Sequence, residues 1–129
     1  MRKLLDCDPG RDDALAILLA YGSSDAELCA ITTVAGNQTL DRTTRNARRL
    51  CTLAGIRDVP SAGCDRPLVR ELVVAPEIHG ESGLDGASLP EPDVPLVAAH
   101  AVAVIVDVVT WRSPCARSRG WRRTSARSC

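Results

Sequence analysis

The sequence predicts an α/β protein, a Rossmann-like parallel sheet with helices on both faces, truncated at its carboxyl end. Two observations favour this fold class. Short apolar stretches of strand length alternate with helical patterns, and brief turns rich in Gly, Asn or Ser separate them. Such an order with short connections is typical of parallel βαβ units. A hydrophobic content of 45% in 129 residues is ordinary for one globular domain.

The first predicted unit covers residues 3–22. Residues 3–7 form a brief apolar run before Pro9-Gly10, as expected of a buried strand that ends in a turn. Asp12 and Asp13 then fall in the first turn of a predicted helix, where the helix dipole favours negative charge. Its apolar residues recur at helical spacing as far as Gly22: Ala14, Leu15, Leu18 and Leu19.

The second predicted unit covers residues 27–55. Residues 27–34 are largely apolar and β-branched in their second half, which predicts a strand covered on both faces. A helix should follow from Thr39 and stop at Gly55. Its apolar stripe comprises Ala47, Leu50, Cys51 and Ala54, and a solvated row faces outward: Arg42, Arg45, Arg48 and Arg49.

The rest of the folded part is less regular. Residues 59–63 are a candidate third strand, and residues 68–74 are a candidate extended piece. Residues 75–93 are rich in Gly, Pro and Glu, which predicts a long loop. A third helical pattern begins near Asp93 and runs to Val108.

The character of the chain changes at about residue 107. We expect residues 1–106 to form the folded portion and residues 107–129 to be a basic tail outside it. Six of the 16 basic residues and no acid follow Trp111. The tail after Trp111 has no Leu, Ile or Val, so it cannot bury an apolar face. This composition is typical of GC-rich coding DNA read out of frame, and a disordered basic arm is the alternative.

Composition also narrows the location and partners. No stretch reaches the roughly 18 to 20 apolar residues of a membrane span, and the apolar run after Lys3 is too short for a signal peptide. We therefore expect a cytoplasmic protein with neither membrane nor nucleic acid as a partner. The six cysteines form no C-x-x-C pair, which disfavours a zinc knuckle and predicts buried thiols rather than disulfides.

The acidic stretch at residues 6–13 is the strongest functional signal. Repulsion among carboxylates at a tight turn is hard to explain unless a cation or sugar hydroxyls take up the charge. Ligands of open α/β sheets bind at the carboxyl ends of the strands, where this stretch and Asn37 are both expected. The alternative for the acidic stretch is a solvated turn without a ligand. The alternative for Asn37 is a turn residue without a functional role. Four aspartates fall within these eight residues: Asp6, Asp8, Asp12 and Asp13.

Three stretches of this sequence resemble the inosine-uridine-preferring nucleoside hydrolase family. They are residues 6–14 (DCDPGRDDA), residues 32–37 (TTVAGN) with residues 43–47 (TTRNA), and residues 78–84 (IHGESGL), which is similar to a His-Gly-x-x-Gly-Leu loop. Order and spacing agree over about residues 3–106. The resemblance implies an enzyme of purine and pyrimidine salvage, which uses a calcium-bound water to cleave the N-glycosidic bond of ribonucleosides.

The same resemblance implies a role for each matching residue. Asp8 would bind Ca²⁺ and act as the general base, and Asp13 would be a second metal ligand. Asp12 would hydrogen-bond the ribose hydroxyls. Asn37 would orient the nucleophilic water or the sugar, and His79 would lie near the leaving base. Asp8, Asn37 and His79 are thus the candidate catalytic residues, and Asp12, Asn37 and His79 the candidate substrate-binding residues.

Other interpretations stay open at this point. Family members are longer, so an inactive truncated remnant or a ribose- or metal-binding fragment is the alternative, and an intact member is expected to form a homo-oligomer. A haloacid-dehalogenase-like phosphatase would use Asp6 and Asp8, but Gly10 stands where that family has Thr or Val. An EF-hand fails because Arg11 occupies the place of its glycine. Asp6 is interpreted as support for the turn.

Overall fold

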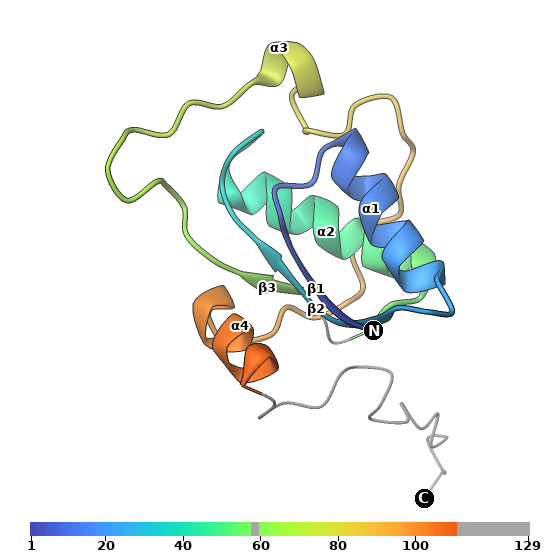
Figure 1. Cartoon of the computed structure of the whole chain (residues 1–129). Helices are drawn as coiled ribbons and strands as arrows, with labels where there is room; N and C mark the ends of the chain where they lie inside the picture. Colours follow the sequence, from blue (N-terminus) through green and yellow to red (C-terminus); the bar gives the residue numbers. More distant parts are fainter. Residues whose placement is uncertain (58–59, 111–129) are drawn as a thin grey trace, which may run out of the picture.

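The computed structural model describes residues 1–57 and 60–110. Within them, three parallel strands form one sheet in the order β1-β2-β3 (Figure 1). The strands are β1 (Arg2–Cys7), β2 (Glu27–Thr33) and β3 (Pro60–Ala62). The helices are α1 (Arg11–Gly22), α2 (Leu40–Ala54), the short α3 (Pro76–His79) and α4 (Ala101–Val109). The predicted parallel α/β architecture is confirmed, including the candidate third strand.

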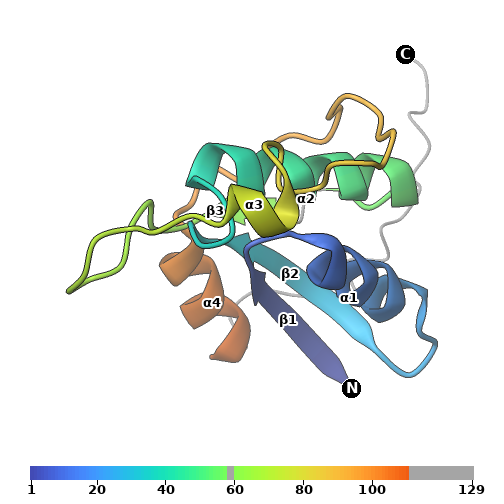
Figure 2. The ribbon, with the colours of Figure 1, turned by 90° about the horizontal axis from the view of Figure 1, so that it is seen from above.

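Helices cover both faces of the sheet (Figure 2). On one face, α1 and α2 pack over β2, and the buried core there includes Ile17, Ile31 and Leu50. On the other face, Val108 of α4 packs with Ala30 of β2. From its second residue to its last, β2 is buried, as predicted for a strand covered on both sides.

The buried face of α1 differs from the predicted stripe. Ile17 and Ala20 are the buried residues of this helix, whereas Leu15 and Leu19 are 70% and 75% exposed. The helix carries apolar residues on most of its circumference, so hydrophobic spacing alone does not identify one buried face. The predicted limits of the helix are correct to within one residue.

Helix α2 agrees with its predicted pattern. Ala47, Leu50 and Cys51 are buried, and Ala54 packs against them. The helix ends at Gly55, whose φ of 70° is the left-handed conformation that glycine adopts most readily.

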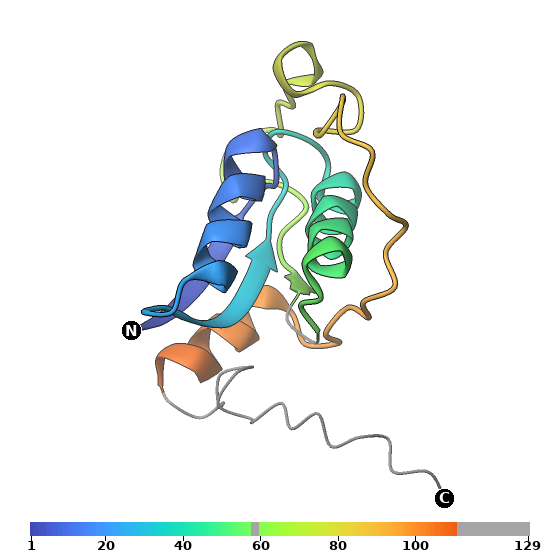
Figure 3. The same cartoon turned by 90° about the vertical axis from the view of Figure 1, so that its right-hand side faces the viewer.

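The predicted helix that begins near Asp93 is wrong in its first two turns. Helix α4 begins only after His100, whose Nδ1 accepts a hydrogen bond from the N–H of Val102 (3.3 Å). Before it, the backbone bonds to other elements instead of to itself, because the N–H of Val97 donates to the carbonyl of Pro60 (2.8 Å). Figure 3 shows this yellow-to-orange segment running along the outer side of α2.

Two irregular stretches differ from prediction as well. The predicted loop at residues 75–93 contains α3, and His79 is the last residue of that helix. Residues 68–74 form no strand in the described structure, and Leu68 and Val69 are 98% and 99% exposed.

The described cysteines follow the prediction in part. Cys7 and Cys51 are buried free thiols, as predicted, whereas Cys64 is a free thiol that is exposed and Cys29 is disulfide-bonded, contrary to the prediction. Burial raises the pKa of Cys51 to about 12. Burial also raises the pKa of Cys7, and the charges of nearby aspartates, Asp13 first, raise it further.

The predicted tail falls mostly outside the described residues. Helix α4 extends to Val109, beyond the expected boundary at residue 107, and residues 111–129 are not among those described. The domain boundary therefore stays a prediction. In the described part of the chain, no helix has both the length and the apolar character that crossing a membrane requires.

Candidate functional site

The acidic turn lies at the carboxyl end of β1, next to the carboxyl end of β2. Oδ2 of Asp8 accepts a hydrogen bond from the N–H of Asn37 (2.6 Å), and Nδ2 of Asn37 donates to the carbonyl of Asp8 (3.1 Å). These bonds form because β1 and β2 are parallel neighbours, so both chains leave the sheet at the same edge. The fold thus brings Asp8 and Asn37 together.

Asp13 contributes a second carboxylate from the first turn of α1. Its Oδ2 accepts a hydrogen bond from the N–H of Asp8 (3.1 Å). Burial raises the pKa of Asp13; the charges of Asp8 and Asp12 and a hydrogen bond with the Asp8 carboxyl act in the same direction, and only the N–H of Asp8 opposes them. Among residues 1–57 and 60–110, no cationic side chain forms an ion pair with either carboxylate. Their repulsion is therefore uncompensated there.

Two glycines allow these groups to approach closely. A Cβ at Gly36 would lie 2.2 Å from Oδ2 of Asp8, so the carboxylate occupies the space that a side chain would need. A Cβ at Gly10 would lie 2.8 Å from Nδ1 of His79 and 3.1 Å from Nδ2 of Asn37. The imidazole and the amide therefore meet over the backbone of Gly10.

His79 reaches the turn from the end of α3. The helix is fixed at its start, because the N–H of Ala75 donates to the carbonyl of Asn37 (3.1 Å). The structure therefore gathers four of the five predicted site residues at the turn: Asp8, Asp13, Asn37 and His79.

Asp12 and Asp6 lie apart from this group. The side chain of Asp12 is exposed on α1, and no hydrogen bond within the described residues joins it to the others. Asp6 is exposed too, and its Oδ1 accepts a hydrogen bond from the hydroxyl of Thr32 on β2 (2.6 Å). That contact fits a residue that supports the strand pair next to the turn.

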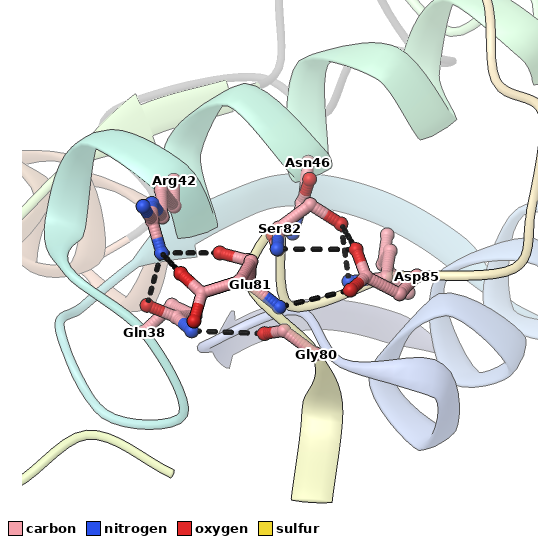
Figure 4. Close-up of polar contacts among 8 residues, drawn as sticks. Gln38, Arg42, Asn46, Gly80, Glu81, Ser82 and Asp85 are labelled. Atoms are coloured by element: carbon pink, nitrogen blue, oxygen red, sulfur yellow. Dashed lines mark hydrogen bonds and ion pairs between the residues drawn. The ribbon is translucent and has the colours of Figure 1, made fainter. Parts of the chain in front are cut away.

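Two buried amides were not predicted from the sequence. Nδ2 of Asn46 donates to the carbonyls of Pro9 (3.2 Å) and Ser82 (2.8 Å). Nε2 of Gln38 donates to the carbonyl of Gly80 (2.9 Å), as Figure 4 shows. A signal for Asn46 existed, because it stands one turn before buried Leu50 and so belongs to the inward side of α2.

The arginine row of α2 is not a simple solvated face, contrary to prediction. It binds the segment of residues 81–94 along the outer side of the helix (Figure 3). Arg42 and Arg45 form ion pairs with glutamates of the segment, and Arg42, Arg48 and Arg49 donate to its backbone carbonyls. The contacts are Arg42 with Glu81, Arg45 with Glu91 (2.8 Å), Arg48 with the carbonyl of Val94 (2.8 Å), and Arg49 with the carbonyls of Leu89 (2.6 Å) and Pro90 (3.0 Å).

The two carboxylates fit part of the shell of a hard cation. Asp8 and Asp13 each bond one oxygen to a backbone N–H, and the two carboxyl groups also lie within hydrogen-bond reach of each other. Oxygen donors with uncompensated charge suit Ca²⁺ better than a soft metal. Within residues 1–57 and 60–110, however, no group of three or more His, Cys, Asp or Glu is arranged as a metal site. Further ligands are needed to reach six to eight.

Sequence comparisons identify the family to which the chain belongs. The family model described as inosine-uridine preferring nucleoside hydrolase matches residues 4–118. The chain is 53% identical over 113 residues to an inosine-uridine preferring nucleoside hydrolase of Crithidia fasciculata, covering 86% of this chain and 36% of that protein. It is 48% identical over 108 residues to a pyrimidine-specific ribonucleoside hydrolase of Photobacterium profundum, covering 83% and 35% respectively.

Solved structures give the same result. A purine-preferring ribonucleoside hydrolase from Gardnerella vaginalis matches with a TM-score of 0.76 and 29% identity, over 85% of this chain and 36% of that one. An inosine-guanosine nucleoside hydrolase matches with a TM-score of 0.74 and 32% identity, over 90% and 37%. The chain spans little more than a third of the length of these relatives. Because the family model covers most of its residues, the chain belongs to the inosine-uridine preferring nucleoside hydrolase family.

Proposed function

We propose that this chain carries one part of a calcium-dependent ribonucleoside hydrolase site, which cleaves the N-glycosidic bond to give ribose and the free base. The observation that supports it most directly is the position of Asp8, bonded to both Asp13 and Asn37 where β1 and β2 end. The relatives named above, all nucleoside hydrolases, support the reaction class. We therefore propose a ribonucleoside as the small-molecule partner. The family match also rules against the haloacid-dehalogenase-like phosphatase considered from the sequence.

Asp8 and Asp13 would hold the cation through the oxygens that no backbone N–H engages. Calcium, when bound, lowers the pKa of the attacking water. Asp8 accepts the proton of that water, and the N–H of Asn37 fixes the orientation of its carboxylate during the transfer. The water oxygen bonds to C1′ of the ribose while the bond from C1′ to the base nitrogen breaks and its electron pair leaves with the base.

The other residues act on the two parts of the substrate. Asp12, exposed at the start of α1, is available to hydrogen-bond the ribose hydroxyls. Negative charge at the turn favours an oxocarbenium-like sugar. His79, which lies over Gly10, would be near the leaving base, and the amide of Asn37 beside it would orient the water or the sugar. A cytoplasmic location and assembly into a homo-oligomer belong to the same proposal.

The test compares two neighbouring aspartates. The purified chain is incubated with inosine and with uridine, with calcium and with a chelator. We expect turnover that is lost on chelation and in Asp8→Asn, but kept in Asp6→Asn, because Asp6 bonds to Thr32 outside the site. A calcium-dependent rise in Tm that Asp8→Asn abolishes, without turnover, would leave only the binding fragment. If the chain shows no turnover and calcium has no effect on its Tm, the proposal is overturned.

A further inference from the structure

The loop that follows His79 is held at two backbone carbonyls by amide side chains from outside the loop. Gln38 donates to the carbonyl of Gly80, the residue directly after His79, and Asn46 donates to the carbonyl of Ser82. Both amides are almost completely buried, with exposed fractions of 1% and 2%. Buried amides keep their partners, because a buried polar group that loses its hydrogen bond destabilises the fold.

Asn46 also bonds to the other half of the site. The same Nδ2 that donates to Ser82 donates to the carbonyl of Pro9, inside the acidic turn between Asp8 and Gly10. One amide nitrogen therefore joins the turn that holds the carboxylates to the loop that holds the imidazole. Its two hydrogens match these two acceptors in number.

Arg42 fixes the orientation of the Gln38 side chain, and Gly83 allows the loop to approach both amides closely. Oε1 of Gln38 accepts a hydrogen bond from Nη1 of Arg42 (3.1 Å), which directs Nε2 toward Gly80 (Figure 4). Gly83 has a φ of +81°, and a Cβ there would lie 3.1 Å from Nδ2 of Asn46 and 3.2 Å from Cγ of Gln38. The loop thus lies directly against both amides at a residue without a side chain.

We propose that Gln38 and Asn46 are positioning residues, which hold the imidazole of His79 over Gly10 beside the carboxylate turn. The inference rests on the proposed function in one respect only, the assignment of His79 to the site. Neither amide touches the reacting atoms. Each acts through the backbone of the loop, so losing either donor displaces His79 without removing it.

The test uses variants that exchange a donor for an acceptor of nearly the same shape. In Asn46→Asp, a carboxylate oxygen faces the carbonyls of Pro9 and Ser82; in Gln38→Glu, the acceptor for Arg42 remains while the donor to Gly80 is lost. Arg45→Gln on the same helix is the control, because it changes only the exposed pair with Glu91.

The readout is the nuclear Overhauser contact between Hα of Gly10 and Hε1 of His79, two groups that the structure brings together. We expect the contact in the wild type and in Arg45→Gln, and its loss in both amide variants. Amide exchange at Gly80 and Gly83 should become about tenfold faster in the variants, as one lost buried hydrogen bond implies. If one amide variant does not fold, the other still gives the comparison.

The outcomes separate this inference from the proposed function. A contact that persists in a folded amide variant, or that is absent from the wild type, overturns the positioning role. In a preparation that hydrolyses ribonucleosides, both variants should lower kcat/KM, and in Gln38→Glu, whose side chain makes no hydrogen bond to the carboxylate turn, the calcium-dependent rise in Tm should be unchanged. If no preparation hydrolyses nucleosides but the contact is lost as expected, the proposed function fails and the positioning role stands.

Discussion

The two halves of the site are held in different ways. The carboxylate turn is fixed mainly by backbone N–H groups, those of Asp8 and Asn37, at the ends of two paired strands. The segment that carries His79 and continues to residue 94 is fixed by side chains of residues 38–49, nearly all of them on α2. The first arrangement follows from sheet formation itself, whereas the second depends on individual donors that substitution can remove one at a time.

The largest effect should come from the core that both halves share. Leu50 of α2 is 3% exposed and packs against the sheet. Leu50→Ala should lower the free energy of unfolding by about 3 kcal/mol, from lost burial and the cavity that remains. Urea denaturation measures it, with Leu53→Ala as the control, because Leu53 is 55% exposed on the same helix. Equal effects of the two variants would show that the halves do not share this core.

A methyl group at Gly36 should disturb the turn without affecting the tethered segment. The new Cβ would lie 2.2 Å from Oδ2 of Asp8, so the carboxylate must move and lose the N–H of Asn37. A displacement of this size near the chemistry costs about 10²-fold in kcat/KM, and the calcium-dependent rise in Tm should disappear. In Gly22→Ala, where a Cβ meets nothing within 4 Å, both measurements should match the wild type. Calcium stabilisation that survives in Gly36→Ala would contradict the turn geometry.

Arg49→Lys should loosen the tethered segment without affecting the turn. The guanidinium donates to the carbonyls of Leu89 and Pro90, and a lysine keeps the charge but loses this two-donor geometry. Local opening should become easier by about 1 kcal/mol, or about fivefold. Hydrogen exchange of the backbone amide of Asp93, which lies in the same segment and donates to the hydroxyl of Thr52 (3.0 Å), should accelerate by that factor, while calcium stabilisation stays constant. Slower or unchanged exchange would remove this tether from the comparison.

The smallest effect concerns the charge of Asp13. Its pKa is raised in the folded state, so the ionised carboxylate destabilises the metal-free fold at pH values above that raised pKa. This cost is lost as the pH falls through the folded pKa toward the ordinary value of 3.8. Without calcium, Asp13→Asn should therefore raise the stability at pH 7 by less than about 1 kcal/mol, since the group is partly exposed. The difference should vanish below pH 3.8.

If Asp13→Asn were instead less stable than the wild type at pH 7 without calcium, that result would contradict the repulsion between the carboxylates of Asp8 and Asp13. Thermal melts of the wild type and of Asp13→Asn from pH 3 to pH 8 give the comparison. The asparagine retains an oxygen that accepts the N–H of Asp8, so loss of that hydrogen bond does not enter the difference. With calcium present, the order should reverse, because the variant has lost a proposed ligand.

The turn was predictable from the sequence because its information is local. A strand, a Pro-Gly turn and a helix start place Asp8 and Asp13 within a few residues of each other, and the parallel strand order then brings Asn37 alongside. The apolar stripe of α2 was equally readable, because Ala47, Leu50 and Cys51 alternate clearly with charged residues.

The tethered segment was not predictable, because its contacts join distant residues. Asn46 and Ser82 are 36 positions apart, and no spacing rule connects a helix polar residue to a loop carbonyl. The residues before α4 have helical apolar spacing, yet Val97 bonds to Pro60 of β3, so tertiary contacts overrode the local pattern. In α1, apolar residues lie on nearly every side of the helix, so the pattern does not separate a buried face from an exposed one. Leu15 and Leu19, which share the helical spacing, are exposed.

The thiol beneath the turn has a consequence for reactivity. Cys7 is 8% exposed, its Sγ donates to the carbonyl of Thr32, and burial and the nearby aspartates raise its pKa. A thiol held in its neutral form is a poor nucleophile, so alkylating reagents and oxidants reach it only when the strand pair opens. Cys64, exposed after β3, has no such protection. The rate at which Cys7 is modified therefore reports how often the strand pair next to the carboxylate turn opens.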